Sequence, residues 1–154
     1  MTTPRRRCSP PASVCMAAAT LTVAGCGGDR SSRQAAQAPA PRAIILQPAT
    51  GDTVGPEVRV VLGVEGIEVV AADGQRVAGQ GHHHLFVDTD VTAADAAIPA
   101  GVPGIVHIGT GAGESTVSGL TPGPHRIIAV LAYGNHVPME GVATDTVVVV
   151  VVAN

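Results

Sequence analysis

The residues of this sequence best suited to chemistry lie between Gly81 and Asp88, in the stretch GHHHLFVD. Three consecutive histidines, half of the six in the chain, run directly into apolar residues that favour a β-strand. Side chains two residues apart on a strand share a face, so we expect His82 and His84 to lie side by side, about 7 Å apart. Two neutral imidazoles at that spacing can bind one metal ion.

Strand alternation also assigns the two faces of this segment. It places His82, His84, Phe86 and Asp88 on one face, and His83, Leu85 and Val87 on the other. Because the charge of Asp88 would be costly to bury without a partner, we expect the Leu85 face to pack against the core. His82 and His84 are then expected to point outward together.

Two more histidines stand at expected strand ends. His107 lies in IVHIGTG and His136 in YGNHVPM, so glycine or proline is close to each. The loops at one end of a β-sandwich can bring such residues to the histidines of the strand. We therefore predict a copper or zinc site made of His82, His84, His107 and His136.

A second group of residues is predicted to assist this site as further ligands or as partners that orient the rings: His83, Met139, Glu114 and Asp88. The Met139 thioether favours copper, and carboxylates accept hydrogen bonds from ring nitrogens. His125 follows a Pro-Gly turn, where we expect it to pack at a corner of the fold. No fixed-spacing motif such as HExxH is present, so a metal-free network of histidines and carboxylates stays an alternative.

The first 25 residues have the features of an export signal. Arginines at positions 5–7 precede an apolar run over residues 12–24, which is too short to span a membrane. The residues before Cys26, LTVAG, resemble the lipobox of bacterial lipoproteins. This resemblance implies cleavage before Cys26 and acylation of its thiol, and several acyl chains would anchor the protein stably on a membrane. Residues 27–42 are rich in Gly, Ser, Gln, Ala and Pro, which predicts a flexible tether.

Composition excludes several functional classes. Without the three arginines of the signal, six arginines face twelve acidic residues, so the net charge changes from −3 to −6. This charge, with one Phe and one Tyr in the chain, argues against nucleic-acid binding. Cys26 is the only cysteine expected in the mature chain, and Ser115 and Ser118 have no recognisable nucleophile context. We therefore expect no enzymatic activity, since a metal-dependent hydrolase would also need an open coordination position.

From residue 43 onward, short apolar runs alternate with Gly and Pro at spacings typical of a β-sandwich. We predict one all-β domain over residues 43–154, an immunoglobulin-like antiparallel sandwich of about seven or eight strands. The expected strands are 43–47, 58–64, 67–71, 82–88, 105–108, 115–120, 126–132 and 142–152. Residues 92–97 have the pattern of one helical turn. The six valines at 147–152 are apolar on both faces and should form a buried or well-covered final strand, because an exposed edge of that composition would aggregate.

Several motifs occur together in this domain: GHHHL at 81–85, Asp88, HxGxGxxE from His107 to Glu114, Pro122-Gly123 with His125, and Asn135-His136 before Pro138. Together they resemble an uncharacterised bacterial envelope family, the domain of unknown function 4399, over about residues 60–150. The resemblance implies an exported single-domain protein and brings no established activity. The positions that match the family pattern are His82, His83, His84, His107, Glu114, His125 and His136. Two residues depart from it: Ile108 replaces a usual aromatic residue, and Met139 stands where a further histidine often follows the proline.

These features predict a lipid-anchored domain on the periplasmic or extracellular face of the cell envelope, at the outer membrane where one is present. Its expected partners are the membrane, through Cys26, and a copper or zinc ion, for metal handling. The alternative is a non-enzymatic interaction module with structural histidines, whose partner is another envelope protein. Four imidazoles turned to one centre would favour the metal, whereas rings facing backbone carbonyls would favour the module.

Overall fold

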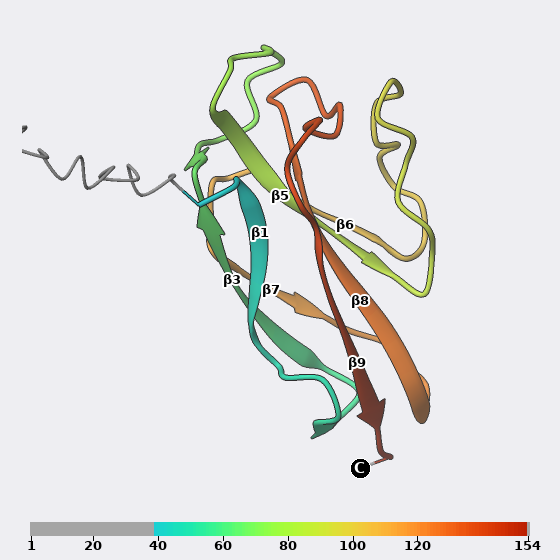
Figure 1. The fold of residues 1–154 in the computed structure, drawn as a ribbon. Helices are drawn as coiled ribbons and strands as arrows, with labels where there is room; N and C mark the ends of the chain where they lie inside the picture. Colours follow the sequence, from blue (N-terminus) through green and yellow to red (C-terminus); the bar gives the residue numbers. More distant parts are fainter. Residues whose placement is uncertain (1–38, 154) are drawn as a thin grey trace, which may run out of the picture. The chain divides into compact units, whose positions relative to one another are not determined.

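The computed structural model describes residues 39–153, so the predicted signal, Cys26 and most of the predicted tether lie outside it. The described strands are β1 (Arg42–Gln47), β2 (Thr53–Val54), β3 (Val58–Glu65), β4 (Glu68–Val69), β5 (Gln80–Val87), β6 (Ile105–Ile108), β7 (Glu114–Val117), β8 (Gly123–Ala132) and β9 (Asp145–Val151). They form two sheets, one in the order β1-β3-β7 and one in the order β2-β9-β8-β5-β4, with β6 also paired to β5 (Figure 1). The predicted all-β sandwich is confirmed.

The details differ from prediction at short strands. The two-residue strand β2 was not predicted, and β4 is shorter than the expected strand at 67–71. Both pair in parallel, β2 with β9 and β4 with β5, so the six-stranded sheet is mixed and not purely antiparallel. The segment expected to form a helical turn has a plain turn at residues 94–95, and no described residue is helical. No helix within residues 39–153 is long and apolar enough to cross a membrane.

The main core lies between the two sheets. It is made by alternate residues of the strands: Ala43, Ile45, Val58, Val60, Leu62, Leu85, Val87, Ile108, Val117, Ile127, Ala129, Leu131, Val147 and Val149, with Met139 from a loop. The face of β3 that alternation predicts to be buried lies in the core, and so do Leu85 and Val87 of β5, as predicted. These small and branched side chains fill the interior without tryptophan.

A second apolar cluster covers the opposite face of β5 and β8. Phe86, Ile128, Val130 and Ala132 form its base, and Ile98 from the segment between β5 and β6 packs on it. Strand β5 is therefore buried on both faces from Gly81 to Val87. His82 and His84 point away from the main core together, as predicted, but they are buried and do not meet solvent.

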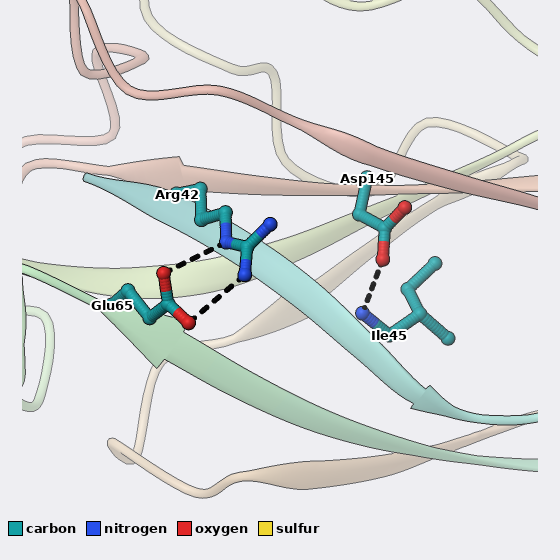
Figure 2. A network of polar contacts seen from close by, with 4 residues as sticks. All are labelled: Arg42, Ile45, Glu65 and Asp145. Atoms are coloured by element: carbon teal, nitrogen blue, oxygen red, sulfur yellow. Dashed lines mark hydrogen bonds and ion pairs between the residues drawn. The ribbon is translucent and has the colours of Figure 1, made fainter. Parts of the chain in front are cut away.

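Strand β1 makes polar contacts with one strand of each sheet, β3 beside it and β9 of the other sheet (Figure 2). The Arg42 guanidinium donates two hydrogen bonds of 2.9 Å to the Glu65 carboxylate on β3. On the other side, the Ile45 amide donates to Asp145 Oδ2 at the start of β9, at 2.8 Å. Asp145 thus satisfies an amide that has no strand partner on that side, and it fixes β1 against β9.

The valine-rich strand β9 is buried on one face only. Val147, Val149 and Val151 face the core, whereas Val148 and Val150 are each 41% exposed. The strand is therefore only half buried, but its edge is covered as the sequence requires, because residues 51–54 hydrogen-bond to Val148, Val150 and Val152 along that side of β9.

Candidate metal centre

The pairing register of β5 and β6 fixes the positions of the first three histidines of the cluster. His82 and His84 project from the face of β5 opposite the main core, two residues apart. His107 on β6 pairs directly with His84, so the two side chains share a face as cross-strand neighbours. On the other side, β8 places Ala132 and Val130 opposite His82 and His84. These apolar neighbours leave the histidine rings as the polar groups of this surface.

The fourth residue, His136, comes from the turn that follows β8. Its backbone has a φ of 67°, a left-handed conformation that costs energy for a residue other than glycine. Two hydrogen bonds hold it there: the His136 amide donates to the Tyr133 carbonyl, and the Ile98 amide donates to the His136 carbonyl, both at 2.8 Å. The fold therefore fixes a strained backbone to turn this ring toward β5.

The four rings meet at one centre. One ligand nitrogen from each of His82, His84, His107 and His136 lies within 4.8 Å of the others. The Nε2 atoms of His82 and His84 are 2.9 Å apart, and those of His107 and His136 are 3.1 Å apart. All six ring-centroid distances lie between 4.7 and 5.7 Å. The structure brings together the four histidines that the sequence predicts as ligands.

Burial keeps the inner rings neutral. Burial lowers the pKa of His82 to about 4, with smaller contributions from neighbouring histidines, and lowers the pKa of His84 to about 3 in the same way. Burial also lowers the pKa of the more exposed His107, and the charge of His136 adds to the effect. The inner rings therefore offer free lone pairs at neutral pH, which is the state that binds a metal ion.

Some of the buried nitrogens of the cluster are not satisfied by the described residues. The Nδ1 atoms of His82 and His84 are buried and have no hydrogen-bond partner. Each unpaired buried polar atom lowers the free energy of unfolding by about 1–3 kcal/mol. The Nδ1 atoms of the inner rings therefore destabilise the fold and do not tie the cluster to its surroundings. Such a cost is expected where function, not stability, determines the arrangement.

A loop formed by residues 70–76, here called the clasp loop, connects the segments that carry the histidines. The Val70 amide donates to the Gly81 carbonyl at 2.8 Å, beside His82, and the Ala72 amide donates to the Gly109 carbonyl at 2.9 Å, near His107. A third contact reaches the turn of His136, where the Gly74 amide donates to the Gly134 carbonyl at 3.0 Å. The clasp loop therefore holds three separate segments of the cluster in one arrangement.

The other predicted site residues lie elsewhere. His83 is buried on the opposite face of β5, where burial lowers its pKa. Met139 belongs to the main core, with its Sδ beside Gly81 on the His83 face, so it does not join the four rings. Glu114 pairs with Arg59 on the neighbouring strand. Asp88 binds His125 and the Arg126 amide, so neither predicted carboxylate orients a ring of the cluster.

His125 has the structural role that its position after the Pro-Gly turn predicts. Its Nδ1 lies 2.6 Å from Asp88 Oδ2, and its Nε2 lies 2.7 Å from the Thr121 carbonyl oxygen. These contacts connect the end of β5 to β8 and to the segment before β8. They also show what a structural histidine looks like in this chain, with both ring nitrogens paired to oxygen atoms.

Gly109 and Asp73 were not predicted to belong to the site. A Cβ atom on Gly109 would overlap Cε1 and Nε2 of His107, so the absence of a side chain lets that ring fold over the loop. Asp73 lies close enough to His82 for its charge to oppose the lowering of that pKa. The spacing HxG was the available signal for Gly109, whereas nothing in the sequence links residue 73 to residue 82.

The fold and the cluster define a class of protein: an all-β sandwich domain with four histidines gathered on the outer face of one sheet. A family model described as "Domain of unknown function (DUF4399)" matches residues 60–152, more than half of the chain. The chain belongs to this family, and all four histidines lie within the matched region. No curated protein and no solved structure matches the chain.

Proposed function

We propose that this domain binds a copper or zinc ion through His82, His84, His107 and His136, and that it serves metal handling at the cell envelope. A lipid anchor at Cys26 would hold it on the membrane. The observation that carries the proposal is the convergence of one nitrogen from each ring within 4.8 Å, from three separate segments of the chain. Four imidazole ligands suit both metals.

A bound cation uses the facing nitrogens more fully than hydrogen bonding does. In each close pair, two Nε2 atoms face each other, and an N–H···N hydrogen bond between neutral rings uses the lone pair of only one of them. A cation instead accepts the lone pair of every ring at once. The two inner rings gain most, because they are buried and cannot exchange their partners for water.

The structural alternative predicts rings that face backbone carbonyls. Only His125 among the described histidines has a hydrogen bond from a ring nitrogen to a backbone oxygen. The ring contacts of His82, His84, His107 and His136 are with one another. This arrangement favours the metal site over a network that only ties loops together.

The donor set limits the choice of metal. The thioether of Met139 lies in the main core, so it adds no soft ligand that would favour copper over zinc. The four ligands are neutral nitrogens, and the described residues add no cysteine to them. Zinc and copper both accept such a set, and we expect Cu(II) to bind more tightly because it stands above zinc in the Irving–Williams order.

The proposal is tested by titrating the purified full chain with Zn(II), Cu(II) and Cu(I), following the heat released and the melting temperature. We expect one ion per chain, a Kd below about 1 μM, and a melting temperature that rises with metal concentration. The H82A/H84A double variant should lose this binding. H125Q is the matched control, because it removes a histidine outside the cluster and should bind as the unchanged chain does.

Weak binding, or binding that the double variant retains, would contradict the proposal. It would favour the alternative of an interaction module. The circular dichroism spectrum of the metal-free double variant must match that of the unchanged chain, so that lost binding is assigned to lost ligands and not to unfolding.

A further inference from the structure

The four histidines differ sharply in their access to solvent. His82 and His84 have 0% and 1% of their surface exposed, whereas His136 is half-buried and His107 is exposed. The floor of the cluster is the buried strand β5, which is paired with β8 on one side and with β6 on the other. Solvent and any incoming ligand therefore reach the centre from the side of His107 and His136.

The two outer histidines also differ in how firmly the backbone holds them. His136 is fixed by its turn and by the amide of Ile98, as described above. His107 lies on β6, a four-residue strand that pairs with β5 alone. Its ring makes a polar contact only with His136 among the described residues. Because His107 is the most exposed of the four and its backbone is less constrained than that of His136, its ring can turn away from the centre most readily.

Gly109 determines where the His107 ring rests. A Cβ atom at this position would overlap the tip of the ring at Cε1 and Nε2, and its three nearest heavy atoms all belong to the His107 ring. The ring is the far end of a side chain that can rotate, so a methyl group here would displace the ring and leave the backbone in place. The backbone of Gly109 is itself held by the hydrogen bond from the Ala72 amide.

We propose that His107 is the exchangeable ligand of the centre, through which the metal enters and leaves, and that Gly109 is the residue that positions it. This inference rests on the proposed function. His82, His84 and His136 form the retained part of the site. An acceptor ligand approaches on the exposed side, takes the coordination position that the His107 ring vacates, and then removes the metal. Such a device suits a protein that delivers metal more than one that stores it.

The test measures zinc transfer from the loaded full chain to a chromophoric chelator in a stopped-flow instrument. We expect G109A to release zinc at least about tenfold faster, the size of effect usual when a group that orients a ligand is lost. G113A is the matched control: it lies in the same loop, and its added methyl would meet only the Leu62 carbonyl oxygen at 3.5 Å, an ordinary contact. Its release rate should equal that of the unchanged chain.

The H107A variant shows whether Gly109 acts through His107. H107A should keep zinc on the other three histidines and release it faster, and adding G109A to H107A should change nothing further. Equal release rates for G109A and G113A would overturn the inference, and so would an additional effect of G109A in the H107A background. If G109A fails to fold, H107A decides: release at the unchanged rate overturns the inference.

These outcomes are separate from failure of the proposed function. That failure appears earlier, as no zinc binding by the unchanged chain or as binding that H82A/H84A retains. If the chain binds zinc through His82 and His84 but G109A and H107A leave the zinc release rate unchanged, the proposed function stands and the proposal of an exchangeable ligand is ruled out.

Discussion

At the scale of single residues, this chain holds histidines in two opposite environments. The four clustered rings face one another, and burial lowers the pKa of the two inner ones to about 4 and 3. His125 lies between the Asp88 carboxylate and the Thr121 carbonyl, both of which accept hydrogen bonds. Because a carbonyl oxygen has no proton to give, both nitrogens of His125 must carry protons to satisfy this site. Neutral rings suit metal binding, and a charged ring suits a structural ion pair.

The pair of His125 and Asp88 makes stability depend on pH. The hydrogen bond to Asp88, followed by that to Thr121, raises the pKa of His125. Burial alone would raise the pKa of Asp88, but the Arg126 amide and His125 outweigh it and lower that pKa. A raised folded-state pKa stabilises the fold fully below the unfolded value of about 6.5, and the contribution disappears as pH rises through the folded value.

We therefore expect H125Q to lower the free energy of unfolding by about 1 kcal/mol at pH 6, and by less at pH 9. Urea unfolding of both proteins across this pH range measures the difference. Asp88 stays ionised over the whole range, so it adds no slope of its own. A difference that is constant with pH, or that grows toward pH 9, would show that His125 is not charged in the folded state.

At the scale of elements, the site depends on segments that carry no ligand. The clasp loop, residues 70–76, bonds to the backbone near His82, His107 and His136, and the Arg76 guanidinium lies 4.5 Å from the centre of the Tyr133 ring. The cluster is therefore assembled by backbone hydrogen bonds between loops and not by the two sheets alone. A change that moves the clasp loop should weaken the site without touching a histidine.

A substitution at Gly134 should move the clasp loop. A Cβ atom there would overlap Asp73 Oδ1 and lie 2.8 Å from the Gln75 carbonyl oxygen, which accepts the Asn135 amide. Because the second contact is with backbone, the loop itself must shift. We expect G134A to lower the free energy of unfolding by about 1–3 kcal/mol and to weaken zinc binding, as urea unfolding and titration would measure. G113A again serves as the control. Equal unfolding free energies and equal zinc affinities for G134A and G113A would contradict the proposed role of the clasp loop.

At the scale of the whole molecule, the six-stranded sheet has apolar cover on both faces along β5 and β8. The main core lies on its inner face, and a second cluster around Phe86 and Ile98 lies on its outer face, continuous along β5 with the histidines. This apolar surround raises the strength of any ion–ligand contact inside it. The predicted lipid anchor would place this domain at a membrane, where metal could be passed to or from other envelope components.

The anchor is tested in cells that express the whole chain. We expect the mature protein to begin at Cys26 with acyl chains attached, as mass spectrometry would show, and to sediment with membranes. The C26S variant should leave the membrane fraction, because a chain without acyl groups has no stable attachment there. A mature chain with an unmodified Cys26, or one cleaved at another residue, would rule out lipidation.

The sequence by itself determined the all-β class, the inner faces of the main strands and the four histidines worth considering as ligands. Alternation assigns Leu85 and Val87 to the core and puts His82 and His84 on one face. The pairing of β5 with β6, which places His107 beside His84, was not predicted, because the expected route was through loops at one end of the sandwich. His125 was placed by its turn. The family was recognisable from the same short motifs.

Only the tertiary structure decided the burial of His82 and His84, the core position of Met139 and the pairing of Asp88 and Glu114 with other residues. Each depends on contacts between residues far apart in the chain. The segment that carries Ile98 covers the outer face of β5 at Phe86, and the clasp loop acts through amides that every residue type except proline supplies. A local pattern specifies which side of a strand a residue occupies, whereas the packing of distant segments determines what covers it.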